Sequence, residues 1–345
     1  MNKRLLLASA LIASGARRLD PTRRGPMLLV VNYHRLWPTG SVGRTMFDDG
    51  VFGPDLETFR RQMQWLKAST IILDEESLLG LRNGSGYPHG TVLSAVTFDD
   101  AYVDCRTLAQ PVLDECGIRG LFFVPVELIE KRQLGWWDQV AYLLKQTPLK
   151  SIVVDGRGYD LASGFRQALR SILELFKLET ADRTAELLTR LADACRIPLP
   201  PLALQSAELM TWQQIRELRA AGHAIGSHTL SHRVLATLDP SEQAREIAGS
   251  RRALEGILCD SVRSFAYPVG GPRHIDRHSI ELVQQAGYGL AFTFNTGFAR
   301  VPPADRLQIP RESAHSFAAL RSKVLLPRLM GLNDQLALEP ASTGN

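Results

Sequence analysis

The chain has 345 residues, of which 45% are hydrophobic and 22% charged, as in an ordinary globular protein. This length favours one large α/β domain that carries an insertion over two complete domains. The net charge is only +4, because 40 basic residues face 36 acidic ones. So weak an excess gives no ground for nucleic-acid recognition, and we expect no nucleic-acid partner.

Four cysteines are scattered along the chain without a C-x-x-C pair, at positions 105, 116, 195 and 259. This spacing argues against a zinc ribbon or a dithiol redox site. It also argues against a small secreted domain held together by disulfides. We expect reduced thiols that are mostly buried.

Residues 1–26 form an N-terminal segment that is either amphipathic or signal-like. Its apolar stretch, residues 5–16, is too short to span a bilayer and lies between basic pairs at 3–4 and 17–18. Cleavage of a signal peptide near Ala16 is one interpretation. Because arginines directly after the stretch fit export poorly, we favour a helix in peripheral contact with an anionic membrane. A cytoplasmic or inner-membrane-associated protein is accordingly favoured over an exported one.

Strand and helix patterns alternate from residue 27 onward. Residues 27–32 (MLLVVN) form an apolar, β-branched run that predicts a buried strand, and Pro54 marks the start of a helix over 55–68. The next predictions are strands over 70–73 and 92–98, a helix over 107–116 closed by Gly117, and a strand over 121–126. Further along, helices are predicted over 241–258 and 275–286, and strands over 262–267 and 290–294.

The segment at about residues 139–208 breaks this alternation. It is mostly helical in pattern, over 165–176 and 180–195, with a polar stretch at 155–160. We interpret it as a helical insertion in a domain that spans 27–330, followed by a tail over 331–345. Strands that alternate with helices predict a parallel sheet or a barrel, whose ligand sites gather at the carboxyl ends of the strands.

Two adjacent carboxylates, Asp99 and Asp100, follow the predicted strand over 92–98. Holding them together is costly unless a cation or a proton lies between them. In an extended chain neighbouring side chains point to opposite sides, so one carboxylate can bind a metal while the other faces a different part of the site. The alternative is a solvated turn at the strand end or a helix cap.

Two histidines, His228 and His232, stand four positions apart. On a helical turn this spacing places both imidazoles on one face, where they can chelate one ion, although such pairs also occur by chance. One aspartate with these histidines makes a three-ligand site that leaves a position for water, as catalytic zinc does. The second carboxylate can then act as a general base.

These residues resemble the motifs of the polysaccharide deacetylase family, carbohydrate esterase family 4, also called the nodulation-type chitooligosaccharide deacetylase homology domain. Residues 97–100 (TFDD) are similar to its first motif, 228–232 (HTLSH) to its second and 265–270 (FAYPVG) to its third. The resemblance covers about residues 27–312. It implies an α/β fold, a distorted (β/α) barrel with about seven parallel strands, and hydrolysis of acetamides on amino sugars.

The resemblance also implies roles for single residues. Asp100, His228 and His232 would bind a divalent metal, for which we expect zinc, with cobalt or nickel as alternatives. Asp99 would be the base that activates the attacking water, and a backbone N–H around Val269 would stabilise the oxyanion together with the metal.

Aromatic residues are the expected substrate contacts. Tyr267 lies in the third motif, and Trp137 belongs to a tryptophan pair with Trp136 after the predicted strand over 121–126. Paired aromatics near a site commonly stack on sugar rings. They can equally serve to seat the inserted helices.

Three positions depart from the family pattern. Ala266 stands where an arginine usually orients the base, and we expect Arg311 to replace it, the alternative being a surface ion pair. Ala101 replaces the usual glycine after the aspartate pair. The late Leu-x-His motif is not evident, so the histidine that protonates the leaving amine is either His34 or His315. We favour His34, because a Tyr-His pair like the one at 33–34 occurs in a subgroup that acts on exopolysaccharides.

The leading functional prediction is therefore N-deacetylation of an N-acetylated glycan or its precursor. An O-acetyl esterase is the alternative within the enzymes, because the same attack cleaves esters. A non-catalytic glycan-binding relative is the alternative from another class. The presence of both aspartates and both histidines argues against that last interpretation.

Overall fold

The computed structural model describes residues 25–43, 45–81, 86–88, 90–178 and 181–321. The predicted amphipathic or signal-like segment up to residue 24 and the predicted tail lie outside these residues. Across the described ranges, no helix is long and apolar enough to cross a membrane. The four cysteines are free thiols, three of them buried and Cys259 exposed, in agreement with the prediction.

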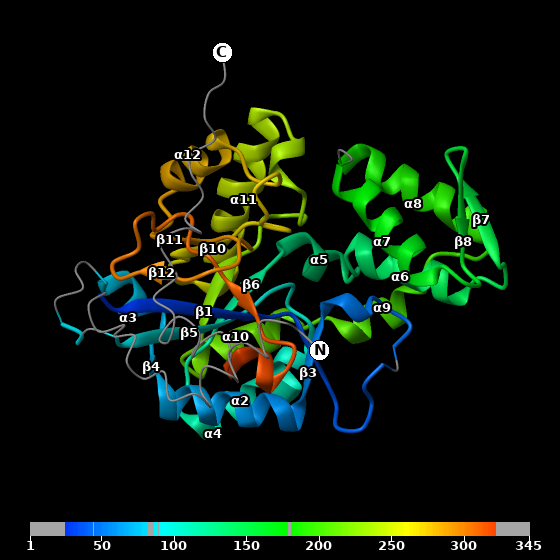
Figure 1. The fold of residues 1–345 in the computed structure, drawn as a ribbon. Helices are drawn as coiled ribbons and strands as arrows, with labels where there is room; N and C mark the ends of the chain where they lie inside the picture. The colour runs from blue at the N-terminus through cyan, green and yellow to red at the C-terminus, as the bar shows by residue number, and fades with distance from the viewer. Residues whose placement is uncertain (1–24, 44, 82–85, 89, 179–180, 322–345) are drawn as a thin grey trace, which may run out of the picture.

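A curled, mostly parallel sheet forms the centre of the molecule (Figure 1). Its main strands run in the order β11 (Leu290–Phe292), β10 (Ser264–Ala266), β9 (Ala224–Ser227), β6 (Leu121–Val124), β5 (Val92–Phe98), β1 (Met27–Tyr33) and β12 (Ala299–Arg300). Two further strands, β4 (Ile71–Ile72) and β13 (Glu312–Ser313), pair with β5 and β1, and β12 runs antiparallel to β1. The predicted α/β fold class is confirmed, with the distorted barrel realised as a half-barrel of seven strands.

The central strands are buried on both faces, which explains their continuous apolar runs. All seven residues of β5 are buried, and β5 pairs in parallel with both β1 and β6. The surrounding helices are α2 (Leu56–Ser69), α3 (Glu75–Gly80), α4 (Gln110–Cys116), α5 (Val126–Lys131), α10 (Trp212–Ala220), α11 (Pro240–Leu258) and α12 (Arg277–Gln285). A separate two-stranded sheet joins β2 (Arg35–Trp37) to β3 (Phe52–Asp55).

Local chemistry sets several of these boundaries. Helix α2 begins at Leu56 because the Asp55 side chain accepts a hydrogen bond from the Thr58 N–H and so caps it. The predicted helix over 107–116 is instead a π-helical turn over Cys105–Ala109 followed by α4, which Gly117 ends in the left-handed region at φ 68°.

A second lobe contains helices α6 (Trp136–Gln146), α7 (Phe165–Leu178), α8 (Ala181–Cys195) and α9 (Leu202–Glu208), and it stands to the right of the sheet in Figure 1. The apolar residues of α6, α7 and α8 form a cluster of their own. The lobe also contains an antiparallel hairpin, β7 (Ser151–Val154) with β8 (Arg157–Asp160), which the sequence analysis did not predict. Asp155 and Gly156 both take positive φ, the geometry of a tight hairpin turn.

Candidate active site

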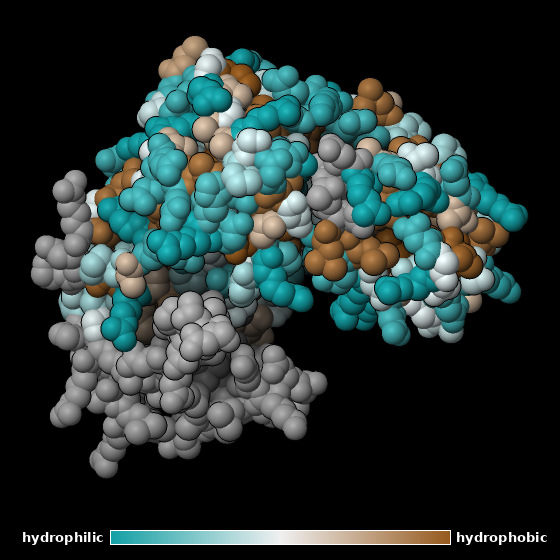
Figure 2. Space-filling model, turned by 90° about the horizontal axis from the view of Figure 1, so that it is seen from above, coloured by the Kyte–Doolittle hydropathy of each residue, from teal (hydrophilic) through white to brown (hydrophobic). Residues whose placement is uncertain are grey.

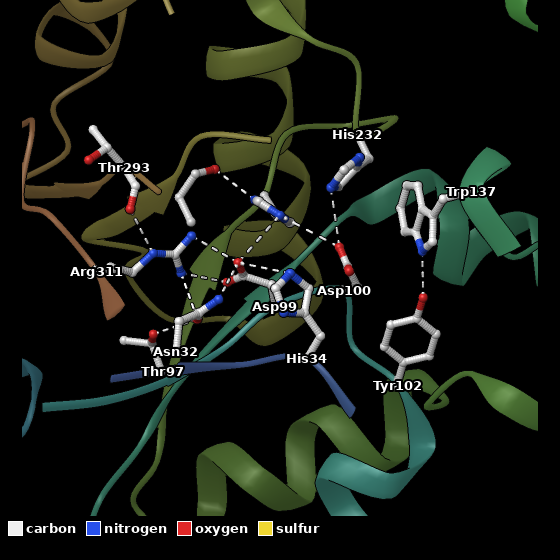
Figure 3. Close-up of polar contacts among 12 residues, drawn as sticks. Asn32, His34, Thr97, Asp99, Asp100, Tyr102, Trp137, His232, Thr293 and Arg311 are labelled. Atoms are coloured by element: carbon white, nitrogen blue, oxygen red, sulfur yellow. Dashed lines mark hydrogen bonds and ion pairs between the residues drawn. The ribbon is translucent and has the colours of Figure 1, made fainter. Parts of the chain in front are cut away.

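Residues from several strand ends line one cavity of about 480 Å³. His34 follows β1, Asp99 follows β5, His228 follows β9 and Val269 lies just beyond β10. These strands run in parallel, so their carboxyl ends meet at one edge of the sheet. Arg311 comes from the C-terminal part of the domain, just before β13, and completes the group (Figure 3).

Asp100, His228 and His232 form the one group of potential metal ligands found among the described residues. One ligand atom from each lies within 4.8 Å of the others, and all three residues are buried. The Asp100 Oδ1 atom is 3.2 Å from His232 Nε2 and 3.6 Å from His228 Nε2. Two ligands of a tetrahedral zinc ion, each about 2.0–2.1 Å from it, are roughly 3.3 Å apart.

The donor set fits a divalent cation. Asp100 Oδ1 is buried and has no hydrogen-bond partner among the described residues, as expected of an atom whose partner is an ion. Burial lowers the pKa of His228 to about 4, so its imidazole is neutral and able to coordinate at neutral pH. The His228 Nδ1 atom lies 2.7 Å from the Ala266 carbonyl oxygen, which leaves Nε2 for the cation.

The backbone at these ligands differs from both geometric assumptions of the sequence analysis. His228 and His232 lie in a loop after β9 rather than on a helical turn, with Thr229 and His232 at φ 68° and 58°. Asp100 and Ala101 take φ 70° and 56°, so the chain after β5 is not extended. The turn brings both aspartates to His228, whose Nε2 is 4.0 Å from Asp99 Oδ2. Left-handed backbone at non-glycine residues costs roughly 1–2 kcal/mol each, so the surrounding packing must impose it.

Asp99 is held by two side chains. Arg311 donates from Nη1 to Oδ1 at 2.7 Å and from Nη2 to Oδ2 at 2.8 Å, and Asn32 Nδ2 donates to Oδ2 at 3.1 Å. Asn32 is itself positioned by the Thr97 hydroxyl, which donates to its Oδ1 at 2.6 Å. Burial alone would raise the pKa of Asp99, but the Arg311 guanidinium, helped by His228 and His34, holds it well below its ordinary value.

Arg311 contacts Asp99, as expected of the residue that replaces the family arginine absent from position 266. The side chain is buried, its Nε donates to the Thr293 carbonyl at 3.0 Å, and its guanidinium lies 5.6 Å from the centre of the Phe123 ring. Phe123 and Ala266 belong to the same hydrophobic cluster. A small residue at position 266 therefore leaves room near Phe123 for an arginine that comes from another segment of the sequence. The contact with Asp99 also rules out the alternative of a surface ion pair.

Both candidate acid histidines lie at the cavity. His34 has a side chain that is 26% exposed, and its Nε2 is 3.8 Å from Asp99 Oδ2. His315 is exposed. The ring of His34 also makes an edge contact with Phe294, 6.0 Å between centroids, which restricts its orientation.

The third motif contributes backbone groups to the site more than side chains. Val269 is at φ 58°, and its N–H has no acceptor among the described residues. Gly270, at φ 62°, could not carry a Cβ without approaching the Phe294 nitrogen to 2.7 Å. The hydroxyl of Tyr267 donates to the Leu307 carbonyl at 3.0 Å, so only the rest of that buried side chain can face the cavity.

The two tryptophans behave differently. Trp137 lines the cavity, and its ring lies 4.4 Å from the His232 ring, between centroids. Trp136 also reaches the cavity but stacks on Phe176 of α7 at 5.4 Å, so it helps to seat the second lobe. Asn32 and Thr97 were not predicted as site residues from the sequence. Both stand at the carboxyl ends of strands, β1 and β5, a position that could have drawn attention to them.

Comparisons with known proteins bear on the family and on the fold. The family model for polysaccharide deacetylases matches residues 88–291. A relative from Bacillus subtilis (strain 168), YxkH, carries a polysaccharide deacetylase name and is 28% identical over 90 residues. That match covers 26% of this chain and 31% of YxkH, so the chain spans about a third of that relative's length.

Two solved structures share the fold. The deacetylase PplD of Streptococcus pyogenes, in complex with acetate, has a TM-score of 0.56 and 16% identity, and covers 87% of this chain and 99% of its own. A de-N-acetylase from Aggregatibacter actinomycetemcomitans has a TM-score of 0.50 and 12% identity, and covers 83% of this chain and 94% of its own. The family match includes both aspartates and both histidines of the site and spans more than half of the sequence; the chain belongs to the polysaccharide deacetylase family.

Proposed function

We propose that this chain is a metal-dependent hydrolase that removes N-acetyl groups from the amino sugars of a polysaccharide, an oligosaccharide or a glycan precursor. The observation that carries the proposal is the meeting of two groups in one cavity. Asp99, kept as a carboxylate by Arg311, lies beside the Asp100, His228 and His232 cluster. Family membership supports deacetylation, and the name of the structurally similar de-N-acetylase supports amide over ester cleavage.

Asp100, His228 and His232 would hold the ion, which we propose to be zinc, with cobalt or nickel as alternatives. Two imidazole nitrogens and one carboxylate oxygen are a donor set that these ions favour. When bound, such a cation polarises an acyl oxygen and makes a coordinated water acidic near neutral pH.

Asp99 acts as the base in this proposal. It accepts the proton of the water that attacks the acetyl carbon, through Oδ2, the oxygen nearer to His228 and His34. Arg311 and Asn32 keep the carboxylate ionised and fix its direction, which reduces the reorganisation needed in the transition state.

Two other groups complete the reaction. The free N–H of Val269 donates to the oxyanion that forms when the water adds to the carbonyl. His34 then gives a proton to the nitrogen as the C–N bond breaks, which releases acetate and the free amine. The 3.8 Å between His34 Nε2 and Asp99 Oδ2 offers a short path by which the proton taken from water reaches the leaving nitrogen. Trp137 at the cavity wall would contact the sugar.

The test is an acetate-release assay of the zinc-loaded protein. N-acetylated glucosamine oligomers are compared with O-acetylated glycans, and Asp99→Asn is the matched inactive control. We expect acetate from the N-acetylated oligomers, loss of activity after chelation, and recovery with zinc or cobalt. Release from O-acetylated glycans alone would make the protein an esterase. Absence of release from every substrate by metal-loaded protein would leave a glycan-binding role.

A further inference from the structure

The two histidines of the cluster are held in different ways. His228 has the usual support, because its Nδ1 lies 2.7 Å from the Ala266 carbonyl oxygen. The Nδ1 of His232 is buried and has no hydrogen-bond partner among the described residues. Its imidazole packs against the indole of Trp137, with ring centroids 4.4 Å apart and planes inclined by 52°, and meets the His228 ring edge-on at 4.7 Å. Because His228 is itself a ligand, the orientation of His232 depends on the indole for support from outside the cluster.

The indole is held by a buried chain of hydrogen bonds. Trp137 Nε1 donates to the Tyr102 hydroxyl at 2.7 Å, as Figure 3 shows. The Tyr102 hydroxyl donates to Asp138 Oδ2 at 2.6 Å, and Asp138 Oδ1 accepts the backbone N–H of Asp48 at 2.9 Å. Tyr102 and Asp138 are 1% and 0% exposed, so no bulk water can replace either partner.

We propose that Tyr102 and Asp138 are positioning residues that fix Trp137 and, through its ring, orient His232 toward the metal. This chain of hydrogen bonds links three segments that are apart in the sequence and meet in the folded protein: the loop after β5, the start of α6 and the loop before β3. It thereby ties the second lobe to the metal site. This inference rests on the metal site of the proposed function, and it adds residues that touch neither substrate nor metal.

The arrangement does not depend on one protonation state of Asp138. Burial raises the pKa of this carboxyl to about 7. As a carboxylate it accepts from the Tyr102 hydroxyl. As a carboxylic acid it can donate to that hydroxyl, whose oxygen has two lone pairs and still accepts from Trp137. The indole N–H keeps its acceptor in both cases.

The test uses Tyr102→Phe, which removes one oxygen and keeps the ring. Zinc affinity of the full chain is measured by competition with a chromophoric chelator, in the absence of glycan. We expect the affinity to fall by roughly 10- to 100-fold, the usual effect of losing a group that orients a metal ligand. Tyr33→Phe is the matched control, because Tyr33 is also buried and its hydroxyl donates to the Gln62 side-chain oxygen of α2 at 2.8 Å, outside the hydrogen-bond chain that holds Trp137. The control should keep the wild-type affinity.

A second measurement reports on the hydrogen-bond chain in metal-free protein, through the exchange of the Trp137 indole N–H with solvent. The indole N–H resonance of Trp137, assigned by its absence in Trp137→Phe, should exchange slowly with solvent in the wild type and much faster in Tyr102→Phe. Asp138→Asn gives a further variant if Tyr102→Phe does not fold. Its amide offers one acceptor in place of two, so a smaller loss of zinc affinity is expected.

The outcomes separate this inference from the proposed function. Wild-type zinc affinity in Tyr102→Phe and Asp138→Asn would overturn the positioning role, whatever the enzyme does to glycans. An equal loss of affinity in Tyr33→Phe would also overturn it, because the effect would then reflect general destabilisation. Wild-type protein that binds zinc but releases no acetate would overturn the proposed function and leave the positioning role standing.

Discussion

Arg311 binds both carboxylate oxygens of Asp99 although the two residues are 212 positions apart in the sequence. The fork of the guanidinium matches the two oxygens, and such paired contacts fix direction as well as charge. Further contacts hold the arginine: the Thr293 carbonyl, the Asn32 side-chain oxygen and the rings of Phe123 and Phe294. Asp99 is thus oriented from the C-terminal part of the domain, while β10 contributes an alanine at the position where the family has arginine.

Removing the charge of Arg311 should change the pH profile. In Arg311→Gln the pKa of Asp99 rises, because the cation that lowers it is gone and burial remains. The base is then protonated at higher pH, so the acidic limb of the pH profile of kcat/KM should move to higher pH and kcat should fall at least tenfold. Arg306→Gln is the control, because Arg306 donates to the carbonyls of Leu78 and Leu79 far from Asp99. An unchanged acidic limb would contradict the role given to Arg311.

The alanine at 266 and the arginine at 311 should be energetically coupled. Ala266 is fully buried in the cluster that contains Phe123, over which the guanidinium lies. Ala266→Arg alone should destabilise the protein by about 3 kcal/mol or more, because it buries a second cation and overfills the cluster. Arg311→Ala should relieve part of that cost. Denaturant unfolding of both single variants and the double variant gives the coupling, expected at about 1–3 kcal/mol; strict additivity would show that the two positions do not share this space.

Measurements of zinc affinity should distinguish Asp99 from Asp100. Asp100→Asn and His228→Ala remove ligands and should lower zinc affinity at least 100-fold. Asp99→Asn should bind zinc within a fewfold of wild type but lose turnover, because both of its oxygens are engaged by Arg311. Isothermal titration of each variant with zinc, beside an acetate-release assay, checks both effects. Loss of zinc by Asp99→Asn to the same extent as by Asp100→Asn would make Asp99 a ligand instead of a base.

The two candidate acid histidines can be ranked by kinetics. His34→Gln should lower kcat by roughly 10²- to 10⁴-fold, the usual effect of losing a general acid. His315→Gln should change it little, because His315 is exposed at the rim while His34 lies 3.8 Å from Asp99. Turnover of each variant on an N-acetylated oligomer decides between them, and the reverse ranking would assign the acid to His315.

Stability of the metal-free protein should depend on His223. This histidine is buried, accepts the Gly120 N–H at 3.1 Å on Nδ1, and has its pKa lowered by burial to about 4. Between about pH 6.5 and pH 4 the unfolded chain binds a proton that the folded protein does not, so stability falls as pH falls through this window. The loss is at most about 3 kcal/mol. His223→Asn keeps an acceptor for Gly120 but does not titrate, so its denaturation midpoint should vary less with pH; an equal slope would contradict the assignment.

Sequence patterns predicted the main strands well where burial and apolar character coincide. The strand over 92–98 is β5 at its full length, and helix α4 ends at the predicted Gly117. The hairpin β7–β8 was not predicted, because its short polar strand and turn resemble a loop until the pairing of the two strands is known. The π-helical turn before α4 was missed because it has no distinct apolar period.

The sequence alone was enough to single out Asp99, Asp100, His228 and His232 as candidate site residues. They follow strand ends, and parallel strands bring such positions to one edge whatever the details of the fold. Their geometry was decided only by the tertiary structure. Left-handed backbone at Asp100 and His232 is unfavourable in isolation, so it arises only where the packed domain imposes it. The bond from Arg311 to Asp99 and the chain from Asp138 to Trp137 likewise join segments far apart in sequence, and no local pattern encodes such a distance in space.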